Sequence, residues 1–263
     1  ARRIIEKIEI SVEDKKPESY KSFSSSELNA ADREAVMKNI LDACIFPLIR
    51  QRPFNKVANP NDVPRDIFVS AYNTAPLSVN VSKVIQNNKD QFQAGLTALS
   101  KLTDGSVYLS SQKSMEFDNV TNVTIEGPHP AGNVGIQIHH IKPINPGEVI
   151  WTVNAQHVIT IGKLFQNGQY DPGCIVSIGG SGSSNPQTVR ALTGSSIESL
   201  LKDQLLNGSQ RIISGDVLTG KRVSSDDYLG FYDSSVAIIN DDVKRPSVSY
   251  THLTLPTRAQ VVM

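Results

Sequence analysis

The sequence of 263 residues has little cysteine and no net charge. Its two cysteines, Cys44 and Cys174, are far apart and have no paired spacing, which argues against a disulfide framework and a cysteine-based metal site and favours a reducing cytoplasm. Lys plus Arg number 26, as do Asp plus Glu, so the chain has no electrostatic footprint for nucleic acid. No apolar run approaches the ~20 residues of a membrane-spanning helix, and we expect neither a direct membrane span nor a signal peptide.

Recognisable catalytic motifs are also missing. No GxGxxG turn joins a strand to a helix, and the glycine-rich loop GGSGSS at 179–184 has no helix directly after it, so a domain junction is favoured over a phosphate cradle. There is no GxSxG elbow and no paired-carboxylate arrangement, and His157 stands in a predicted helix without an evident partner. The sequence therefore assigns no catalytic residue.

Hydrophobic periodicity alternates between strand and helix through the first two thirds of the chain. The pattern predicts strands at 67–72, 107–110, 123–125 and 174–180, and helices at 90–102 and 154–167. A further helix is expected after a cap at Asn29, with Val36, Ile40 and Cys44 on its apolar face. Strands and helices at this spacing imply an α/β fold with a parallel, doubly wound sheet. Beyond it, a helix at 197–205 and short β segments indicate a small α+β module.

The segment 126–165 concentrates the unusual residues. It contains Trp151, which we expect in the core or an interface, the turn GPHPAG at 127–132 and three of the five histidines: His129, His139 and His140. Gly127, Gly132 and Gly135 suit a positive φ or a close backbone approach. The histidine spacing does not fit a metal site, so none is predicted. His129 lies between two prolines, and we expect its ring nitrogens to form hydrogen bonds with backbone groups of the following segment.

This segment resembles the A-subunit family of the bacterial sodium-translocating NADH:quinone oxidoreductase. The resemblance rests on GPHPAG, the tryptophan ahead of Asn-x-Gln, VITIGKLF, RPFNK and IFVSAYNTAPL upstream, and NPQTVRALTGSS and RIISGDVLTG downstream, in that order over about 18–240. It implies a Rossmann-like α/β domain followed by a small α+β β-grasp (SLBB) module. The domains expected are the last strand of a truncated barrel-like domain at 1–16, the Rossmann-like domain at 17–180, the SLBB module at 181–245 and a non-native tail at 246–263.

The resemblance also implies a role. The chain would be a peripheral subunit on the cytoplasmic face of the bacterial inner membrane, bound to the other subunits and to ubiquinone, while FMN, FAD and iron–sulfur centres lie elsewhere in the complex. Flavin-carrying proteins of similar fold have a glycine-rich flavin loop. Here the matching stretch is ACIFPLIRQRPFNK at 43–56, which argues against a cofactor in this chain.

The segment IRQRPFNK at 49–56 is the candidate quinone site. A quinone head group needs an apolar or aromatic wall and donors for its carbonyl oxygens. Phe54 with Arg50 or Arg52, beside Pro53 and Lys56 and backed by Phe46 and Leu48, could supply them. The same residues also suit a solvated basic loop that docks onto a neighbouring protein of the complex.

Other roles stay open for the histidines and for the chain. His139 or His140 could donate a proton near a reduced quinone, because histidine titrates near neutral pH. The chain could instead be a pure interaction scaffold with a decayed ligand site, or an autonomous flavin- or NAD-dependent oxidoreductase, which would need the phosphate-binding loop that is missing.

Overall fold

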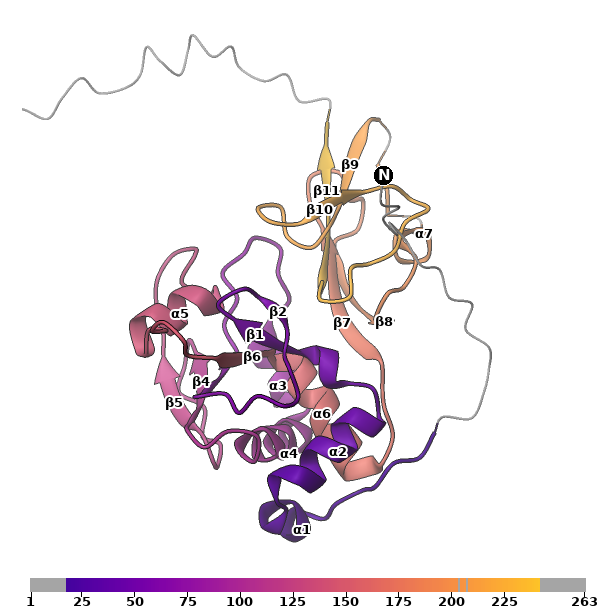
Figure 1. Ribbon diagram of the computed structural model, residues 1–263. Helices are drawn as coiled ribbons and strands as arrows, with labels where there is room; N and C mark the ends of the chain where they lie inside the picture. The colour runs from indigo at the N-terminus through magenta and orange to yellow at the C-terminus, as the bar shows by residue number, and fades with distance from the viewer. Residues whose placement is uncertain (1–17, 203, 207, 242–263) are drawn as a thin grey trace, which may run out of the picture. The chain divides into compact units, whose positions relative to one another are not determined.

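The computed structural model describes residues 18–202, 204–206 and 208–241. These residues fall into two compact units that divide between Ile175 and Val176 (Figure 1). The barrel strand expected at 1–16 and the non-native tail expected at 246–263 lie outside the described residues.

The first unit is built on a six-stranded sheet in the order β2-β1-β6-β3-β4-β5. Four neighbouring strands run parallel, as predicted; they are β6 (Ile150–Asn154), β3 (Ile67–Ser70), β4 (Val107–Ser111) and β5 (Thr121–Thr124). β6 was not among the predicted strands, and the strand predicted at 174–180 belongs to the second sheet. An antiparallel hairpin extends the sheet beside β6, and it consists of β1 (Ile49–Arg52) and β2 (Lys56–Val57). The segment 49–56, expected as a loop, is therefore this hairpin.

One face of the sheet is covered by helices, most of which begin with a side-chain cap. They are α1 (Ser25–Ala30), α2 (Arg33–Asp42), η1 (Phe46–Leu48), α3 (Val81–Gln86), α4 (Lys89–Ser100) and α6 (Ala155–Asn167). In α6 the Asn154 side chain accepts from the N–H of Gln156, and Gly168 ends the helix in the left-handed conformation. The predicted helices 90–102 and 154–167 are thus confirmed.

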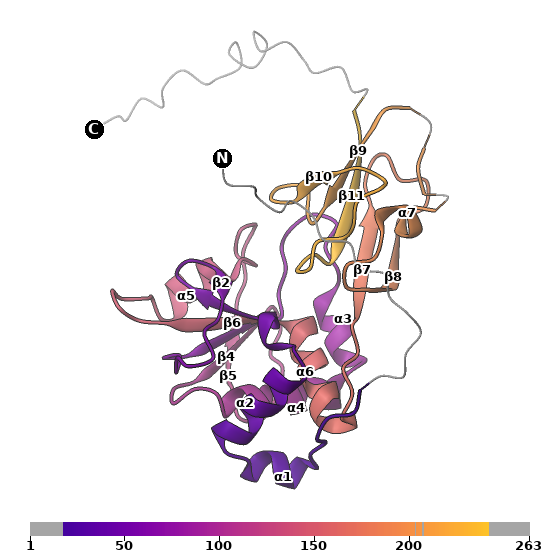
Figure 2. The ribbon, with the colours of Figure 1, turned by 45° about the vertical axis from the view of Figure 1, so that its right-hand side comes forward.

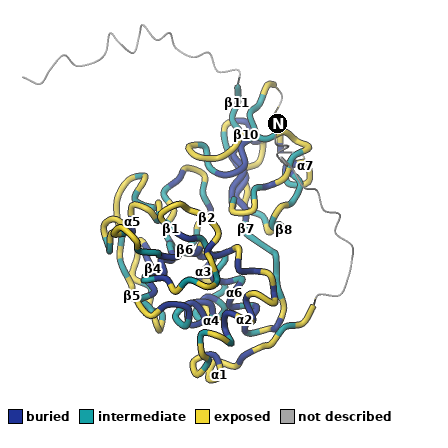
Figure 3. Tube along the Cα trace, in the orientation of Figure 1, coloured by how far each residue is buried: buried dark blue, intermediate teal, exposed yellow. Residues whose placement is uncertain are grey.

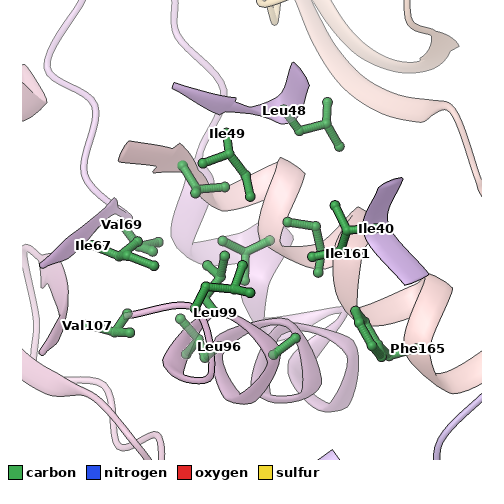
Figure 4. Packing of buried hydrophobic residues seen from close by; sticks show 14 of the residues in the cluster. Ile40, Leu48, Ile49, Ile67, Val69, Leu96, Leu99, Val107, Ile161 and Phe165 are labelled. Atoms are coloured by element: carbon green, nitrogen blue, oxygen red, sulfur yellow. The ribbon is translucent and has the colours of Figure 1, made fainter. Parts of the chain in front are cut away.

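The main core lies between the sheet and helices α4 and α6 (Figures 3 and 4). Ile67 and Val69 of β3 point towards Leu96 and Leu99 of α4 (Figure 4). Trp151 is fully buried there and meets Phe46 edge to face, so its expected place in the core is confirmed. The two helices touch at glycines: a Cβ on Gly95 would overlap the Val158 carbonyl oxygen.

Helix α5 (Val134–Ile141) covers the opposite face of the sheet (Figure 2). Ile138 packs there against Phe68 of β3 and Ile150 of β6. Phe68 also stacks on Tyr108, with ring centroids 4.8 Å apart. Alternate residues of each strand therefore serve two separate apolar layers, as expected of a sheet buried on both faces.

The second unit is a mixed five-stranded sheet in the order β10-β9-β11-β7-β8 with one short helix. Its elements are β7 (Gly173–Gly179), β8 (Gln187–Leu192), α7 (Ile197–Leu200), β9 (Gln210–Ser214), β10 (Lys221–Val223) and β11 (Ser235–Asn240). β11 pairs parallel with β7 and antiparallel with β9. The predicted α+β composition is confirmed, although α7 ends at Leu200 rather than at residue 205.

Two expectations about the first helices are wrong. Asp32 caps α2 by accepting from the N–H of Ala35, while Asn29 lies inside α1, which begins after the capping box of Ser24 and Glu27. Cys44 does not belong to the apolar face: it follows the helix with φ of 56° and is exposed.

Candidate functional site

The two arginines of the hairpin lie on the α5 face of the sheet. Arg52 is paired across the ladder with Ile150, and Arg50 with Thr152. Directly paired residues share a face, and Ile150 belongs to the apolar layer under α5. The strand β1 therefore presents both guanidinium groups on the side where α5 lies.

Arg52 has a partly buried side chain for which the described residues provide no acceptor. Its Nε is shielded from solvent without a hydrogen-bond partner, and so is the Nε of Arg50. Arg50 nevertheless donates from Nη2 to the carbonyl oxygen of Asn55 in the hairpin turn. Burial, followed by the neighbouring charge of Arg50, lowers the pKa of Arg52 from its ordinary value. A desolvated donor without an acceptor costs free energy, so this position favours a ligand that brings an oxygen.

The apolar surroundings of the arginines differ from the expected ones. Phe46 and Leu48 are buried in the core on the other side of the sheet, so they do not back the arginines. Phe54, next to Pro53 in the hairpin turn, is 83% exposed. Val57, which is 45% exposed, pairs with Arg50 and lies on its face. Val57 is therefore an exposed apolar side chain on the face of Arg50, and Phe54 is exposed in the adjoining turn.

Lys56 lies on the opposite face of the hairpin from the two arginines. Lys56 pairs with Gln51. Side chains alternate between the two faces of a strand, so Gln51 lies on the face opposite to Arg50 and Arg52. The structure thus brings Arg50 and Arg52 together and leaves Lys56 apart from them.

Helix α5 brings a second part of the sequence to the arginines. A Cβ built on Gly135 would lie 3.9 Å from Nη1 of Arg52 and would meet nothing else within 4 Å. His139 follows Gly135 by four residues and so lies on the same side of the helix, and it is exposed. We call the surface made by Arg50, Arg52, Val57 and Gly135 the arginine surface. His140 is displaced by a further 100° around the helix.

The turn GPHPAG forms a separate polar cluster at the carboxyl ends of the parallel strands. His129 Nδ1 lies 3.1 Å from Oγ1 of Thr74, which also accepts from the N–H of Gly132 at 3.0 Å. His129 therefore ties the turn together through a threonine hydroxyl, not through a direct bond to the backbone. Gly127 has φ of 146°, and a Cβ on Gly132 would overlap Thr74, which confirms the expectation for both glycines.

The expectation for Gly135 is wrong. Its φ is not positive, and no backbone approaches it closely.

The stretch 43–56, which was matched to the flavin loop, also does not follow a parallel strand: it forms the end of α2, η1 and the hairpin. The connection that leaves the first parallel strand, β3, is 71–80, and it contains no glycine.

Two groups whose partners could not be predicted from the sequence hold the elements of the site in place. Asp66, just before β3, is fully buried and binds Lys142 after α5, with Nζ 2.8 Å from Oδ2. It also accepts from Arg65 at 2.6 Å and from the N–H of Ser106 at 3.1 Å. Nothing in the sequence marks this aspartate, because its partners are distant along the chain.

His157 is the second group. Burial lowers its pKa to about 4, while its hydrogen bond to the Leu48 carbonyl acts in the opposite direction. The expectation that it has no partner is wrong: the neutral ring links the first turn of α6 to the residue just before β1. No local pattern marks this bond, because Leu48 lies more than 100 residues before His157 in the sequence.

The described residues contain no helix long and apolar enough to cross a membrane. Within the same ranges, no group of three or more His, Cys, Asp or Glu residues could hold a metal ion.

Two protein-family models match the chain. One, described as the NqrA second alpha/beta domain, matches residues 31–170, which is more than half of the sequence. The other, described as the NQRA C-terminal domain and labelled SLBB, matches residues 175–225.

Curated proteins similar to the chain are named as the A-subunit of Na(+)-translocating NADH-quinone reductase. The protein of Saccharophagus degradans is 36% identical over 255 residues, which cover 95% of this chain and 57% of that protein. The protein of Tolumonas auensis is 38% identical over 226 residues, covering 84% of this chain and 51% of that protein. The chain thus spans about half the length of the curated relatives it matches.

A solved structure shares the fold. The crystal structure of an NAD+-reducing NiFe hydrogenase in the air-oxidized state matches with a TM-score of 0.55 and 12% identity, over 82% of this chain and 50% of that chain. At this identity the likeness concerns the fold alone.

Proposed function

This chain belongs to the NqrA family, and from that membership we propose that it is part of the peripheral NqrA component of a sodium-pumping NADH:ubiquinone oxidoreductase. In this role it contributes quinone binding and assembly of the complex, and it carries no redox cofactor of its own. The names of its relatives support the proposal. Because the chain spans about half of their length, the activity, ubiquinone as substrate and the partner subunits are all part of the proposal.

The electron carriers are assigned to other subunits. NADH would pass electrons through FMN, FAD and an iron–sulfur centre to ubiquinone, and this chain would lie at the cytoplasmic face of the bacterial inner membrane. The absence of glycine from 71–80 supports this assignment, because a Cβ keeps backbone N–H groups away from a phosphate.

The main support for quinone binding is that Arg52 is a partly buried donor without an acceptor among the described residues. A quinone carbonyl is neutral and accepts hydrogen bonds, so it can take an N–H of Arg52 without bringing a second charge into the site. Val57 on the face of Arg50 and the exposed Phe54 of the adjoining turn offer the apolar area that a head group requires. Arg50, also on this surface, is the second donor of the proposed site.

The remaining predicted residues have narrower roles in this proposal. Pro53 shapes the hairpin turn that carries Phe54, and Lys56 flanks the site from the other face. Gly127, His129 and Gly132 fix the turn that leads into α5 and do not contact the quinone. His139, on the same side of α5 as Gly135, is the candidate proton donor to the reduced quinone, in preference to His140.

Binding of a short-tailed ubiquinone to this chain tests the proposal. Calorimetry should give saturable binding that weakens at least about tenfold in Arg52→Ala, the loss expected when a hydrogen bond to a charged group is removed. Lys56→Ala is the matched control on the opposite face and should bind as the wild type does. Equal affinity of all three proteins would contradict the proposed site.

A second candidate function is an interaction scaffold without a quinone site. The observation that favours it is Phe54, because an aromatic ring exposed at a hairpin tip beside arginines also suits a protein interface. Under this alternative the chain does not bind quinone, and Phe54→Ala weakens its association with the other subunits. An autonomous flavin- or NAD-dependent enzyme is the third candidate, and purified protein with a flavin spectrum would favour it.

A further inference from the structure

Helix α5 contains a glycine that the fold does not require. Three glycines lie inside described helices, and two of them have a packing reason: Cβ atoms on Gly95 and Gly162 would overlap the carbonyl oxygens of Val158 and Gln91, where α4 and α6 touch. Gly135 has no such neighbour. Its only contact within 4 Å would be Nη1 of Arg52 at 3.9 Å, an ordinary van der Waals distance.

Backbone conformation does not explain Gly135 either. Its φ lies outside the left-handed region, and glycine inside a helix is less stable than alanine. The residue is exposed, so an alanine could be accommodated at this position. What a larger side chain would change is the open space in front of the Arg52 guanidinium.

We propose that Gly135 is the position that controls access to Arg52: the missing side chain leaves room for an oxygen acceptor of the ligand, the quinone carbonyl, to reach the guanidinium. This inference rests on the proposed function and adds a specificity-determining residue on α5 to it. A side chain at 135 acts by bulk alone, because the Arg52 donors stay where they are. The size of residue 135 therefore sets how closely a ring approaches the arginine surface.

The test measures unfolding and quinone binding of Gly135→Ala and Gly135→Leu in this chain. Gly135→Ala should unfold at a temperature higher by about 1 to 3 °C, because alanine favours the helix. Its dissociation constant for short-tailed ubiquinone should rise by a few fold, and that of Gly135→Leu by at least tenfold. Lys83→Leu, on the exposed side of α3, controls for the addition of an exposed leucine and should bind as the wild type does.

Each contrary result has a distinct meaning. A lower unfolding temperature in Gly135→Ala would show that the fold needs the glycine, and it would overturn the inference whether or not quinone binds. Unchanged binding in Gly135→Leu together with loss in Arg52→Ala would overturn the inference and leave the proposed function standing. Failure of the wild type to bind quinone would overturn both.

Discussion

Lys142 and Asp66 form an ion pair that fastens the end of helix α5 to the start of the central strand β3. The Nζ atom of Lys142 lies 2.8 Å from Oδ2 of Asp66, and Asp66 is fully buried. Arg65 binds the same carboxylate and also donates to the carbonyl of Lys142 at 2.9 Å. These contacts fix α5 against the sheet and so determine where Gly135 stands relative to Arg52.

Removing the charge of Asp66 should destabilise the first unit. Asp66→Asn leaves Lys142 and Arg65 without their carboxylate, and loss of one partner of a buried ion pair costs about 3 kcal/mol. Denaturant unfolding at pH 7 measures this change. Asp104→Asn, at an exposed position before β4, should alter the free energy of unfolding by less than about 0.5 kcal/mol. Equal stability of the two variants would mean that the pair does not hold α5.

Acid should remove the contribution of Asp66. Burial alone would raise the pKa of this carboxyl, but hydrogen bonds from Lys142, Ser106 and Arg65 outweigh it and lower the pKa below the ordinary value. A depressed carboxyl pKa stabilises the fold above the unfolded value of about 4, and this stabilisation is lost as the pH falls further. The unfolding free energy of Asp66→Asn should therefore fall less below pH 4 than that of the wild type.

His157 should make stability depend on pH in a higher range. Its pKa is about 4 in the fold and about 6.5 when unfolded, so the unfolded chain binds the extra proton between these values. Stability should be complete above about pH 6.5 and fall by about 3 kcal/mol as the pH approaches 4. In His157→Gln this part of the loss should disappear, as measured by urea unfolding at several pH values. Parallel curves for the two proteins would refute the buried neutral ring.

The contact between α4 and α6 should not tolerate a methyl group. In Gly162→Ala the new Cβ would overlap the carbonyl oxygen of Gln91, and overpacking of this kind costs about 2 to 3 kcal/mol or prevents folding. Gly135→Ala is the matched substitution at a helical glycine without such a neighbour. Thermal unfolding should shift down in the first variant and up in the second, and a shift of the same sign in both would contradict the packing described.

The two histidines of α5 should differ in function although they are adjacent. In the assembled complex, His139→Gln should lower quinone reduction, because His139 shares the side of Gly135, whereas His140→Gln should leave turnover near that of the wild type. Both side chains are exposed, so neither variant is expected to unfold. Equal turnover in both variants would exclude a proton-donor role for His139.

The sequence predicts the secondary structure well where local patterns dominate. The 3.6-residue period, the Asn154 cap and Gly168 place α6 correctly, and the apolar run at Ile67 predicts a buried parallel strand. Periodicity cannot predict which strands pair. The hairpin at 49–57 was expected as a loop because its pairing with β6 joins residues about 100 positions apart, and short strands with charged residues carry little local signal.

The sequence singled out the two arginines of the candidate site, but it did not predict how the surrounding residues are arranged. Proximity in sequence suggested that Phe46 and Leu48 back the arginines, yet both lie in the 3-10 helix before β1 and are buried in the main core on the other side of the sheet. Lys56 is separated from Arg52 by the alternation of side chains along the hairpin, because it pairs with Gln51. Gly135 could not be linked to Arg52 from sequence, because their contact depends on how α5 crosses the sheet.

Hydrogen exchange of this chain with and without a short-tailed ubiquinone shows directly whether the quinone binds at the arginine surface. We expect added protection in the hairpin, residues 49–57, and in α5, residues 134–141, with no change in the turn at 127–132. That protection should be absent in Arg52→Ala and retained in Lys56→Ala. Binding that protects other segments and leaves both the hairpin and α5 unchanged would contradict the assignment of the quinone to the arginine surface.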